Sequence, residues 1–344
     1  MTRTILLTGA SGVVGKALLP RLLRSGDRVV ALVHRTPVTH PGVTSIRGDV
    51  AAPRLGLSER DHAALARQVD VVVHAAAVTD FNRSDGSLEA TNIAGTSNMV
   101  ALAEAAGALL YHVSTAFVGV GSTVGRGEQA AGYAASKAQG EDVVRRATVP
   151  HVILRPSVVI GDSETGEMAA FQGLHQVVQG LFAGLVPIIP FDAAWPIDFV
   201  PVDVVADCIA TVVEKRVTEG ELWLAAGDRA LRLDDAMDVA VEWAHRCGVE
   251  VDTPRFVTPD LWDRLIAPVF LDELPDFVAR SVTRMLEFFT TYLQDGQTKP
   301  SSLRELEALG AMPLPDQTES LAASLHHWAD VKGHHLCEAT RSAA

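Results

Sequence analysis

The chain has 344 residues, 48% of them hydrophobic and 21% charged, a composition typical of a globular protein with a large core. Its formal net charge of −13 argues against nonspecific binding to nucleic acid or to an anionic membrane, because both need a basic surface. The three cysteines are far apart and form no C-x-x-C pair, which predicts reduced thiols. Neither a membrane-spanning run nor a signal peptide is recognisable, so we expect a cytoplasmic protein.

A glycine-rich turn near the N-terminus joins a predicted strand to a predicted helix. The apolar run Ile5-Leu6-Leu7 leads into Thr8-Gly9-Ala10-Ser11-Gly12-Val13-Val14-Gly15, after which apolar residues recur at helical spacing. Glycine lets a pyrophosphate approach the backbone closely, and the helix N-terminus offers unpaired N–H groups. The spacing is G-x-x-G-x-x-G rather than the commoner G-x-G-x-x-G of dinucleotide folds. Taken alone, the turn is also compatible with an ordinary strand-to-helix connection.

The predicted second strand, residues 28–35, ends in His34-Arg35 and carries no carboxylate there. In dinucleotide folds an acidic residue at this position binds the adenosine ribose 2′-hydroxyl, whereas a basic residue accommodates a 2′-phosphate. The planar, charged guanidinium of Arg35 suits a phosphate, which favours NADPH over NADH. The alternative is that Arg35 is a solvated arginine at the end of a strand.

Further candidate cofactor contacts follow the next two predicted strands. Asp49 can accept a hydrogen bond from the adenine amino group while Val50 packs on the ring, although Asp49 can equally cap the next segment. The following apolar strand contains His74, which we interpret as a structural hydrogen-bonding residue. It ends in Ala75 and Ala76, whose small side chains allow the backbone to lie close to a ligand.

Strands and helices alternate over about 160 residues, which predicts an α/β fold with a Rossmann-type, doubly wound parallel sheet. We expect residues 1–161 to bind NADP, with residues 198–226 packing back onto this domain. Residues 162–197 and 227–344 are expected to form a smaller, mainly helical C-terminal substrate-binding region. Within it, residues 268–293 are rich in large apolar side chains, which predicts either core packing or a wall for an apolar substrate.

Two pairs of side chains form a candidate catalytic set. Tyr133 and Lys137 are four residues apart in a predicted helix and therefore share a face. An ammonium beside a phenol lowers the phenol's pKa, which makes tyrosine a usable general acid near neutral pH. Ser114 and Thr115 end the preceding strand, and either hydroxyl can bond a carbonyl oxygen on which charge develops during hydride transfer. The Y-x-x-x-K spacing is common by chance, but its place after the glycine turn and the Ser-Thr pair indicates a hydride-transfer site.

The order of these motifs is similar to that of the extended short-chain dehydrogenase/reductase (SDR) superfamily, over roughly residues 4–215. Residues 154–166 and 198–207 resemble the branch that contains fatty acyl-CoA reductases and the thioester-reductase domains of carrier-protein assembly lines. The matching motifs are Thr8-Gly9-x-x-Gly12-x-x-Gly15, Asp49-Val50, His74-Ala75-Ala76, Asn92-x-x-Gly95-Thr96, Val113-Ser114-Thr115-Ala116, Tyr133-x-x-x-Lys137 and Arg155-Pro156-Ser157.

The resemblance implies hydride delivery from NADPH to a carbonyl or thioester carbon, with Thr115, Tyr133 and Lys137 as catalytic residues. It puts the catalytic hydroxyl at Thr115 rather than Ser114, and the nicotinamide carboxamide beside Pro156-Ser157. The predicted cofactor-binding residues are Thr8, Gly9, Ser11, Gly12, Val13, Gly15, His34, Arg35, Asp49, Val50, Ala75, Ala76, Asn92, Tyr133, Lys137, Pro156 and Ser157. No metal ligands are expected, because the C-terminal histidines have no carboxylate or cysteine at ligand spacing.

The sequence thus predicts an NADPH-dependent oxidoreductase that reduces an acyl thioester, or the derived aldehyde or ketone, free or attached to a carrier protein. Two alternatives stay open: an NAD(P)-dependent epimerase or dehydratase of a nucleotide sugar, and a noncatalytic NADP-binding regulator. His34-Arg35 and the apolar C-terminal segment argue against the first. The presence of both Tyr133 and Lys137 argues against the second. No nucleic-acid or membrane partner is expected, and a homodimer is left open.

Overall fold

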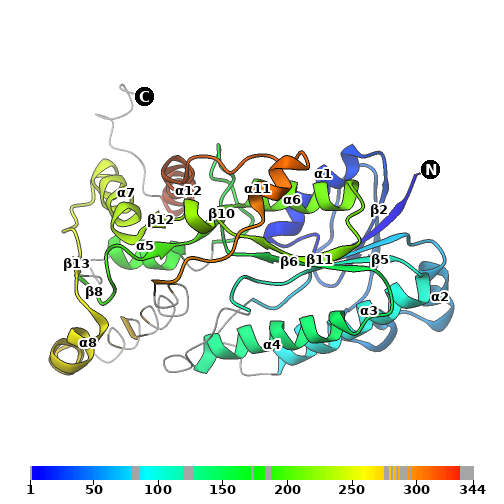
Figure 1. Cartoon of the computed structure of the whole chain (residues 1–344), viewed down its shortest axis with the longest axis horizontal. Helices are drawn as coiled ribbons and strands as arrows, with labels where there is room; N and C mark the ends of the chain where they lie inside the picture. The colour runs from blue at the N-terminus through cyan, green and yellow to red at the C-terminus, as the bar shows by residue number, and fades with distance from the viewer. Residues whose placement is uncertain are drawn as a thin grey trace.

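A parallel sheet of seven strands lies at the centre of the protein, in the order β11-β6-β5-β4-β1-β2-β3 (Figure 1). Its strands are β1 (Thr4–Thr8), β2 (Arg28–Val33), β3 (Val43–Arg47), β4 (Val71–His74), β5 (Leu109–Val113), β6 (His151–Pro156) and β11 (Glu219–Leu224). The structure, a computed structural model, describes residues 2–79, 86–118, 128–171, 174–182, 187–274, 279, 282–283, 286, 293 and 296–333.

The chain order reverses between β1 and β4, which is the topological switch point of a doubly wound sheet. In such sheets ligands bind in the crevice beyond the carboxyl ends of the strands at this point. The glycine turn follows β1, and Ala75-Ala76 follows β4, so the predicted cofactor residues of these two segments meet there. The predicted α/β, Rossmann-type fold is confirmed.

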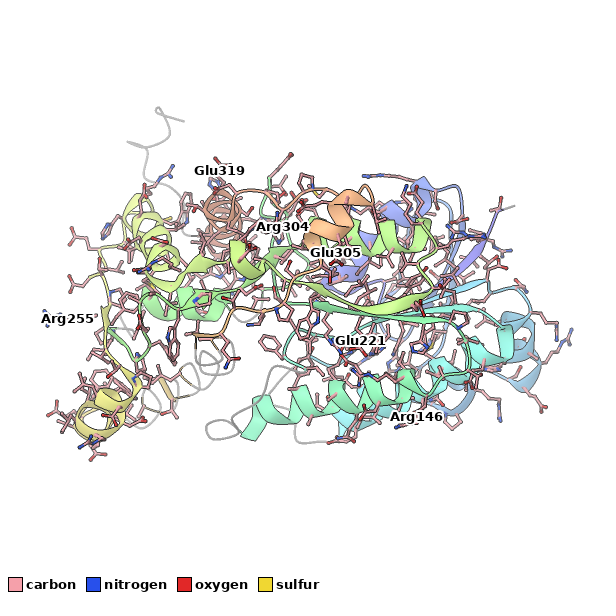
Figure 2. All side chains as sticks on the ribbon, viewed as in Figure 1. Arg146, Glu221, Arg255, Arg304, Glu305 and Glu319 are labelled. Carbon is pink, nitrogen blue, oxygen red and sulfur yellow. The ribbon has the colours of Figure 1, made fainter. Side chains whose placement is uncertain are left out.

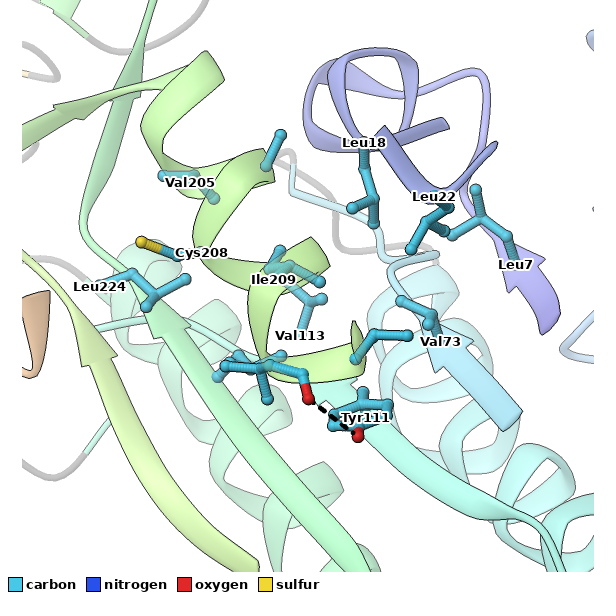
Figure 3. Close-up of a cluster of buried hydrophobic side chains, with 14 of the residues drawn as sticks. Leu7, Leu18, Leu22, Val73, Tyr111, Val113, Val205, Cys208, Ile209 and Leu224 are labelled. Carbon is cyan, nitrogen blue, oxygen red and sulfur yellow. Dashed lines mark hydrogen bonds between the residues drawn. The ribbon is translucent and has the colours of Figure 1, made fainter. Parts of the chain in front are cut away.

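Helices cover both faces of the sheet, which explains why its central strands are almost continuously apolar. One face carries α1 (Val13–Arg24), α6 (Val202–Glu214) and α11 (Leu303–Ala308). Figure 3 shows Leu18 and Leu22 of α1 and Ile209 of α6 packed toward the strands. Tyr111 of β5 lies in this layer, and its hydroxyl donates to the carbonyl oxygens of Val212 and Val217 at 3.1 and 3.0 Å.

The opposite face carries α2 (Glu59–Ala66), α3 (Gly95–Ala106) and α4 (Glu128–Arg145). The short helical turns η1 (Pro53–Gly56) and η2 (Glu89–Ala94) complete this layer. The π-helical turn η2 runs directly into α3, so the two form one continuous helical segment whose winding changes after Asn92. This winding puts Asn92 in the interior, between the β4 end and α4.

A smaller, mainly helical region lies at one end of the sheet (Figure 1). Three two-stranded ladders join it together: β7 with β10, β9 with β12, and β8 with β13. Its elements are β7 (Val158–Ile160), α5 (Leu174–Phe182), β8 (Ile188–Ile189), β9 (Pro196–Ile197), β10 (Phe199–Pro201), η3 (Gly227–Arg229), β12 (Leu231–Arg232), α7 (Leu233–Arg246), β13 (Arg255–Phe256), α8 (Pro259–Leu261), η4 (Trp262–Ile266), α9 (Ala267–Asp272) and α12 (Gln317–Lys332).

The core of this region is a separate apolar cluster centred on α7 and α12, with Trp243, Leu325 and Trp328 buried in it. The cluster also includes Tyr133, so it reaches the candidate catalytic helix. Within segment 198–226, β11 pairs with β6 of the main sheet and α6 packs beside α1, whereas β10 pairs with β7 of the smaller region. The division of the chain into two domains stays a prediction, as does the role of residues 268–293, most of which lie outside the described residues.

The helices in the described part of the chain lack the length and apolar character needed to cross a bilayer. Among these same residues, histidine, cysteine and carboxylate side chains nowhere gather in a group that could hold a metal ion.

Candidate active site

The glycine turn is shaped by close contacts between backbone segments. Gly9 has a φ of +72°, and a Cβ atom there would lie 2.5 Å from the carbonyl oxygen of Ala75. A Cβ atom at Gly15 would lie 2.0 Å from the carbonyl oxygen of Gly9. Gly12 is the exposed N-cap of α1, with no capping side chain and no acidic residue in the first helical turn. An uncapped helix N-terminus behind a tight glycine turn fits the pyrophosphate of a dinucleotide.

The predicted adenosine contacts meet at the corner after β2 and β3. His34 and Arg35 are exposed just beyond β2, and His34 Nε2 lies 3.7 Å from Asp49 Oδ2. The other carboxylate oxygen of Asp49 accepts a hydrogen bond from the backbone N–H of Ala51 at 2.9 Å. Asp49 therefore caps its own turn, which is one of the two roles that the sequence left open. Its contact with an adenine amino group stays a prediction. Val50 is buried at this corner, as a residue packing beneath an adenine ring would be.

Two of the predicted cofactor residues have side chains that bond to the protein itself. The hydroxyl of Thr8 is buried, accepts from the N–H of Ala76 at 3.1 Å and contacts His74 Nδ1 at 2.8 Å. The amide of Asn92 accepts from the N–H of Val78 at 2.9 Å and donates to its carbonyl oxygen at 3.0 Å. These side chains hold the walls of the site in place, and their contact with a cofactor stays a prediction.

The structure brings Thr115, Tyr133 and Lys137 together at the buried end of β5. The hydroxyl groups of Tyr133 and Thr115 are hydrogen-bonded to each other. Thr115 Oγ1 also accepts from the N–H of Phe117 at 3.4 Å. Ser114 Oγ is buried too, and no group in the described residues pairs with it. This arrangement favours Thr115 over Ser114 as the partner of Tyr133.

The pKa of Tyr133 differs from the sequence-based expectation. Burial raises it to about 12, the bond to Thr115 opposes this rise, and the charge of Lys137 is not among its causes. The Lys137 ammonium instead donates a hydrogen bond to the carbonyl oxygen of Val113 at 2.9 Å. Burial lowers the pKa of Lys137 itself to about 8, and the charge of Glu141 opposes this shift. Tyr133 is thus fully protonated near neutral pH, while Lys137 is mostly charged.

Glu141 is one helical turn beyond Lys137 and is completely buried. Arg155 binds it with two hydrogen bonds of 2.9 and 2.7 Å, and Arg145 with one of 2.8 Å. Both arginines also bond to Glu221 of β11, which Figure 2 shows beside the sheet on its α4 side. Sequence analysis missed Glu141, although its i+4 spacing from Lys137 put it on the face of the helix that carries Tyr133.

The predicted nicotinamide end holds a second set of residues that sequence analysis missed. Ser157 Oγ is buried without a partner in hydrogen-bonding geometry in the described chain, although its hydroxyl lies close enough to lower the pKa of Asp198. Asp198 is buried and accepts from the N–H groups of Ala226 and Gly227 at 3.0 and 2.8 Å. Burial nevertheless raises the pKa of Asp198 overall.

The charge of Lys299, a buried residue from the C-terminal region, also opposes this rise. Lys299 Nζ lies 6.0 Å from the ring centroid of Phe117, two residues after Thr115. The C-terminal region therefore supplies a buried cation next to the Thr115 end of the site.

Comparison with known proteins identifies the family. Residues 38–209 match the family model described as Male sterility protein, an NAD-binding family. The chain belongs to this family. The match confirms the sequence-based prediction of an NAD(P)-dependent oxidoreductase of the extended SDR superfamily.

The curated relatives that the chain matches are much longer proteins. The chain is 30% identical over 230 residues to the hybrid PKS-NRPS synthetase pvhA of Talaromyces variabilis, in an alignment that covers 62% of the chain and 6% of that relative. It is 31% identical over 237 residues to a linear gramicidin synthase of Brevibacillus parabrevis, covering 58% of the chain and 5% of the relative. The chain thus spans only a small fraction of the relatives it matches.

Solved structures extend the likeness over nearly the whole chain. The terminal R domain of the myxalamid PKS-NRPS pathway is 25% identical, with a TM-score of 0.76 over 97% of this chain and 92% of that one. The NRPS reductase domain of Mycobacterium tuberculosis has a TM-score of 0.71 at 21% identity, over 97% and 93% of the two chains. The UDP-glucuronic acid 4-epimerase of Bacillus cereus, in complex with NAD, has a TM-score of 0.62 at 18% identity, over 95% and 99%.

Proposed function

We propose that the protein uses NADPH to reduce an acyl thioester carried by a carrier protein, with Thr115, Tyr133 and Lys137 as its catalytic residues. The observation that carries this proposal is the buried hydrogen bond between Tyr133 and Thr115, beside the Lys137 ammonium. The likeness to a terminal reductase domain and the synthetase relatives support the substrate class. A structure of a thiolation-reductase di-domain, at 16% identity and a TM-score of 0.72, has the same fold.

NADPH, when bound, supplies the hydride. Thr115 and Tyr133 hydrogen-bond the carbonyl oxygen of the substrate, on which negative charge develops as the carbonyl carbon accepts the hydride. Tyr133 then gives its phenol proton to this oxygen. Its raised pKa suits the role of donor, because the phenol stays protonated at neutral pH until a strongly basic oxyanion forms. With a thioester, the product of this step is a hemithioacetal, which breaks its C–S bond to release an aldehyde and a thiol.

The preference for NADPH rests on Arg35. Its guanidinium is exposed at the corner after β2, and no ion pair engages it in the described residues. A free guanidinium can form two parallel hydrogen bonds to a 2′-phosphate. The carboxylate of Asp49 at the same corner is occupied on one oxygen by Ala51 and faces His34 with the other, which reduces its capacity to bind a ribose 2′-hydroxyl.

The test is a substrate panel followed through the absorbance of the reduced nicotinamide. Purified protein and NADPH are mixed with an acyl-carrier thioester, an acyl-CoA, an aldehyde, a ketone or a UDP-sugar, and Tyr133→Phe serves as the inactive control. We expect NADPH consumption with the thioester and release of a free thiol. Turnover of the UDP-sugar without net loss of NADPH would overturn the proposal in favour of an epimerase. Consumption with the ketone alone would restrict the activity to free carbonyls.

A further inference from the structure

We propose that His74 is a positioning residue that joins the glycine turn after β1 to α4, the helix that carries Tyr133. Its Nδ1 atom holds the turn, and its Nε2 atom supports the helix. The effect on catalysis rests on the proposed function, whereas the effect on nucleotide binding does not. His74 is completely buried at the end of β4, and its ring faces the layer that contains α3 and α4. Its two ring nitrogens contact the hydroxyl groups of Thr8 and Thr96, so it would act on the site through these residues.

The Nδ1 side of the ring holds the glycine turn. Thr8 Oγ1 lies 2.8 Å from His74 Nδ1 and accepts a hydrogen bond from the N–H of Ala76 at 3.1 Å. The contact fixes the end of β1 against the end of β4. Gly9 follows Thr8 directly, and its Cα is so close to Ala75 and Ala76 that an added Cβ would lie 2.5 to 2.7 Å from their backbone atoms. A shift of Thr8 would therefore displace the turn that is expected to bind the pyrophosphate.

The Nε2 side of the ring leads to Tyr133 through three buried polar groups. His74 Nε2 lies 3.3 Å from Thr96 Oγ1, which donates to the carbonyl oxygen of Asn92 at 2.7 Å. Asn92 Nδ2 donates to Ser136 Oγ at 3.0 Å, and Ser136 Oγ donates to the carbonyl oxygen of Tyr133 at 2.7 Å. This series of bonds ends on the backbone of the residue that is proposed to give the proton.

The bonding pattern selects one form of the ring. Thr96 has its single hydroxyl proton directed at the carbonyl oxygen of Asn92, so it accepts from His74, and Nε2 must carry the proton. Nδ1 is then the acceptor, and Thr8, which already accepts from Ala76, donates to it. Burial, and secondly the charge of Lys137, lower the pKa of His74 to about 3, so this neutral form persists across the range in which the enzyme would work.

The neighbouring strand provides a matched control. His112 pairs with His74 in the β4–β5 register, its ring centroid is 5.4 Å away, and it is equally buried. No protein group among the described residues bonds to either of its ring nitrogens. His112 thus shares the packing environment of His74 without its hydrogen bonds.

The test separates the two sides of the ring. His74→Asn keeps a polar group near the Nδ1 position, and His74→Gln keeps one near the Nε2 position. We expect His74→Gln to raise the Kd for NADPH about tenfold with a smaller effect on kcat, and His74→Asn to lower kcat about tenfold with a smaller effect on the Kd, the size expected for one lost buried hydrogen bond. NADPH affinity is measured by fluorescence titration without substrate, so a failure of the proposed reaction leaves this measurement intact.

His112→Asn and His112→Gln are the packing controls. Both are expected to lower the melting temperature while leaving the Kd and kcat within about twofold, because His112 anchors neither segment. The proposal is overturned if His74→Asn and His74→Gln change the Kd and kcat to the same extent. It is also overturned if the His112 variants reproduce these changes, because His74 would then contribute only packing. The ¹⁵N chemical shifts of the wild-type ring give an independent check, since a protonated Nδ1 would overturn the proposal even if no variant folds.

Discussion

Lys137 Nζ donates a hydrogen bond to the carbonyl oxygen of Val113 at 2.9 Å, and Val113 immediately precedes Ser114 and Thr115. The bond therefore ties the helix that carries Tyr133 to the strand end that carries Thr115. The cost of burying the ammonium is visible in its pKa, which burial lowers to about 8. A lysine that loses its charge close to physiological pH makes the site sensitive to alkali.

As the pH rises above about 8, the titration of Lys137 should lower the activity but raise the folding stability. We expect kcat/KM to fall as the pH rises through about 8, because Lys137 then loses its proton. In the unfolded chain the same group titrates near 10.5, so between about pH 8 and 10.5 the unfolded state binds more protons than the native state. Folding stability therefore gains from Lys137 as the pH rises across this window.

This prediction is checked by measuring kcat/KM and the free energy of unfolding across the same pH range. In the stability measurement, wild-type protein is compared with Lys137→Met, since surface groups also titrate in this range and the difference isolates Lys137. If activity above pH 8 is lost together with stability, alkaline unfolding rather than deprotonation of Lys137 limits the enzyme.

Removal of the Thr115 hydroxyl should be far more damaging than removal of the Ser114 hydroxyl. Thr115→Ala deletes the hydrogen-bond partner of Tyr133 and a proposed donor to the substrate oxyanion, so we expect kcat to fall about 10²- to 10³-fold. Ser114 Oγ has no partner among the described groups, and Ser114→Ala should change kcat only a few-fold. Steady-state kinetics of both variants decide the matter, and the reverse order would mean that the alignment of this motif is displaced by one residue.

Substitution of Arg35 tests the cofactor preference. Arg35→Ala should raise the KM for NADPH about 10- to 100-fold, the effect of losing a charge-assisted bond to a phosphate, and should leave the KM for NADH nearly unchanged. Arg47→Ala, at the exposed end of β3, serves as a control for the loss of surface positive charge. Equal effects of Arg35→Ala on both cofactors would remove the assignment to NADPH.

The sequence predicted the parts of the site that depend on local order. The glycine spacing, the apolar strands and the four-residue interval between Tyr133 and Lys137 are properties of single segments, and the parallel sheet brings those segments to one edge. The fold and the family followed from them. The pKa of Tyr133 did not follow, because it depends on how deeply the tertiary structure buries the phenol and on its bond to Thr115.

Contacts between residues far apart in the sequence could not be predicted, because they too depend on the tertiary structure. Lys299 carries no local signal of function, and it meets Asp198 only because segments far apart in the chain pack together. Thr8 and Asn92 were recognised as part of the cofactor region, but whether their side chains face a ligand or the protein is decided by tertiary contacts.

The buried carboxylate of Glu141 gives the last prediction. Glu141→Gln preserves the shape of the side chain but removes the charge that binds Arg155 and Arg145. The buried Arg155 guanidinium keeps its bond to Glu221 but loses the charge of its partner on α4, so we expect the free energy of unfolding to fall by about 1.5–3 kcal/mol, the contribution of a hydrogen bond to a charged group. Asp142→Asn is the matched control: Asp142 also bonds to Arg145, at 2.9 Å, but it is 57% exposed, and its removal should cost less than about 1 kcal/mol. Glu141 also opposes the effect of burial on the pKa of Lys137, so the alkaline loss of activity should begin at lower pH in Glu141→Gln than in wild type. Denaturant titration and a pH profile measure the two effects, and comparable stability losses in both variants would show that Glu141 behaves as a surface charge.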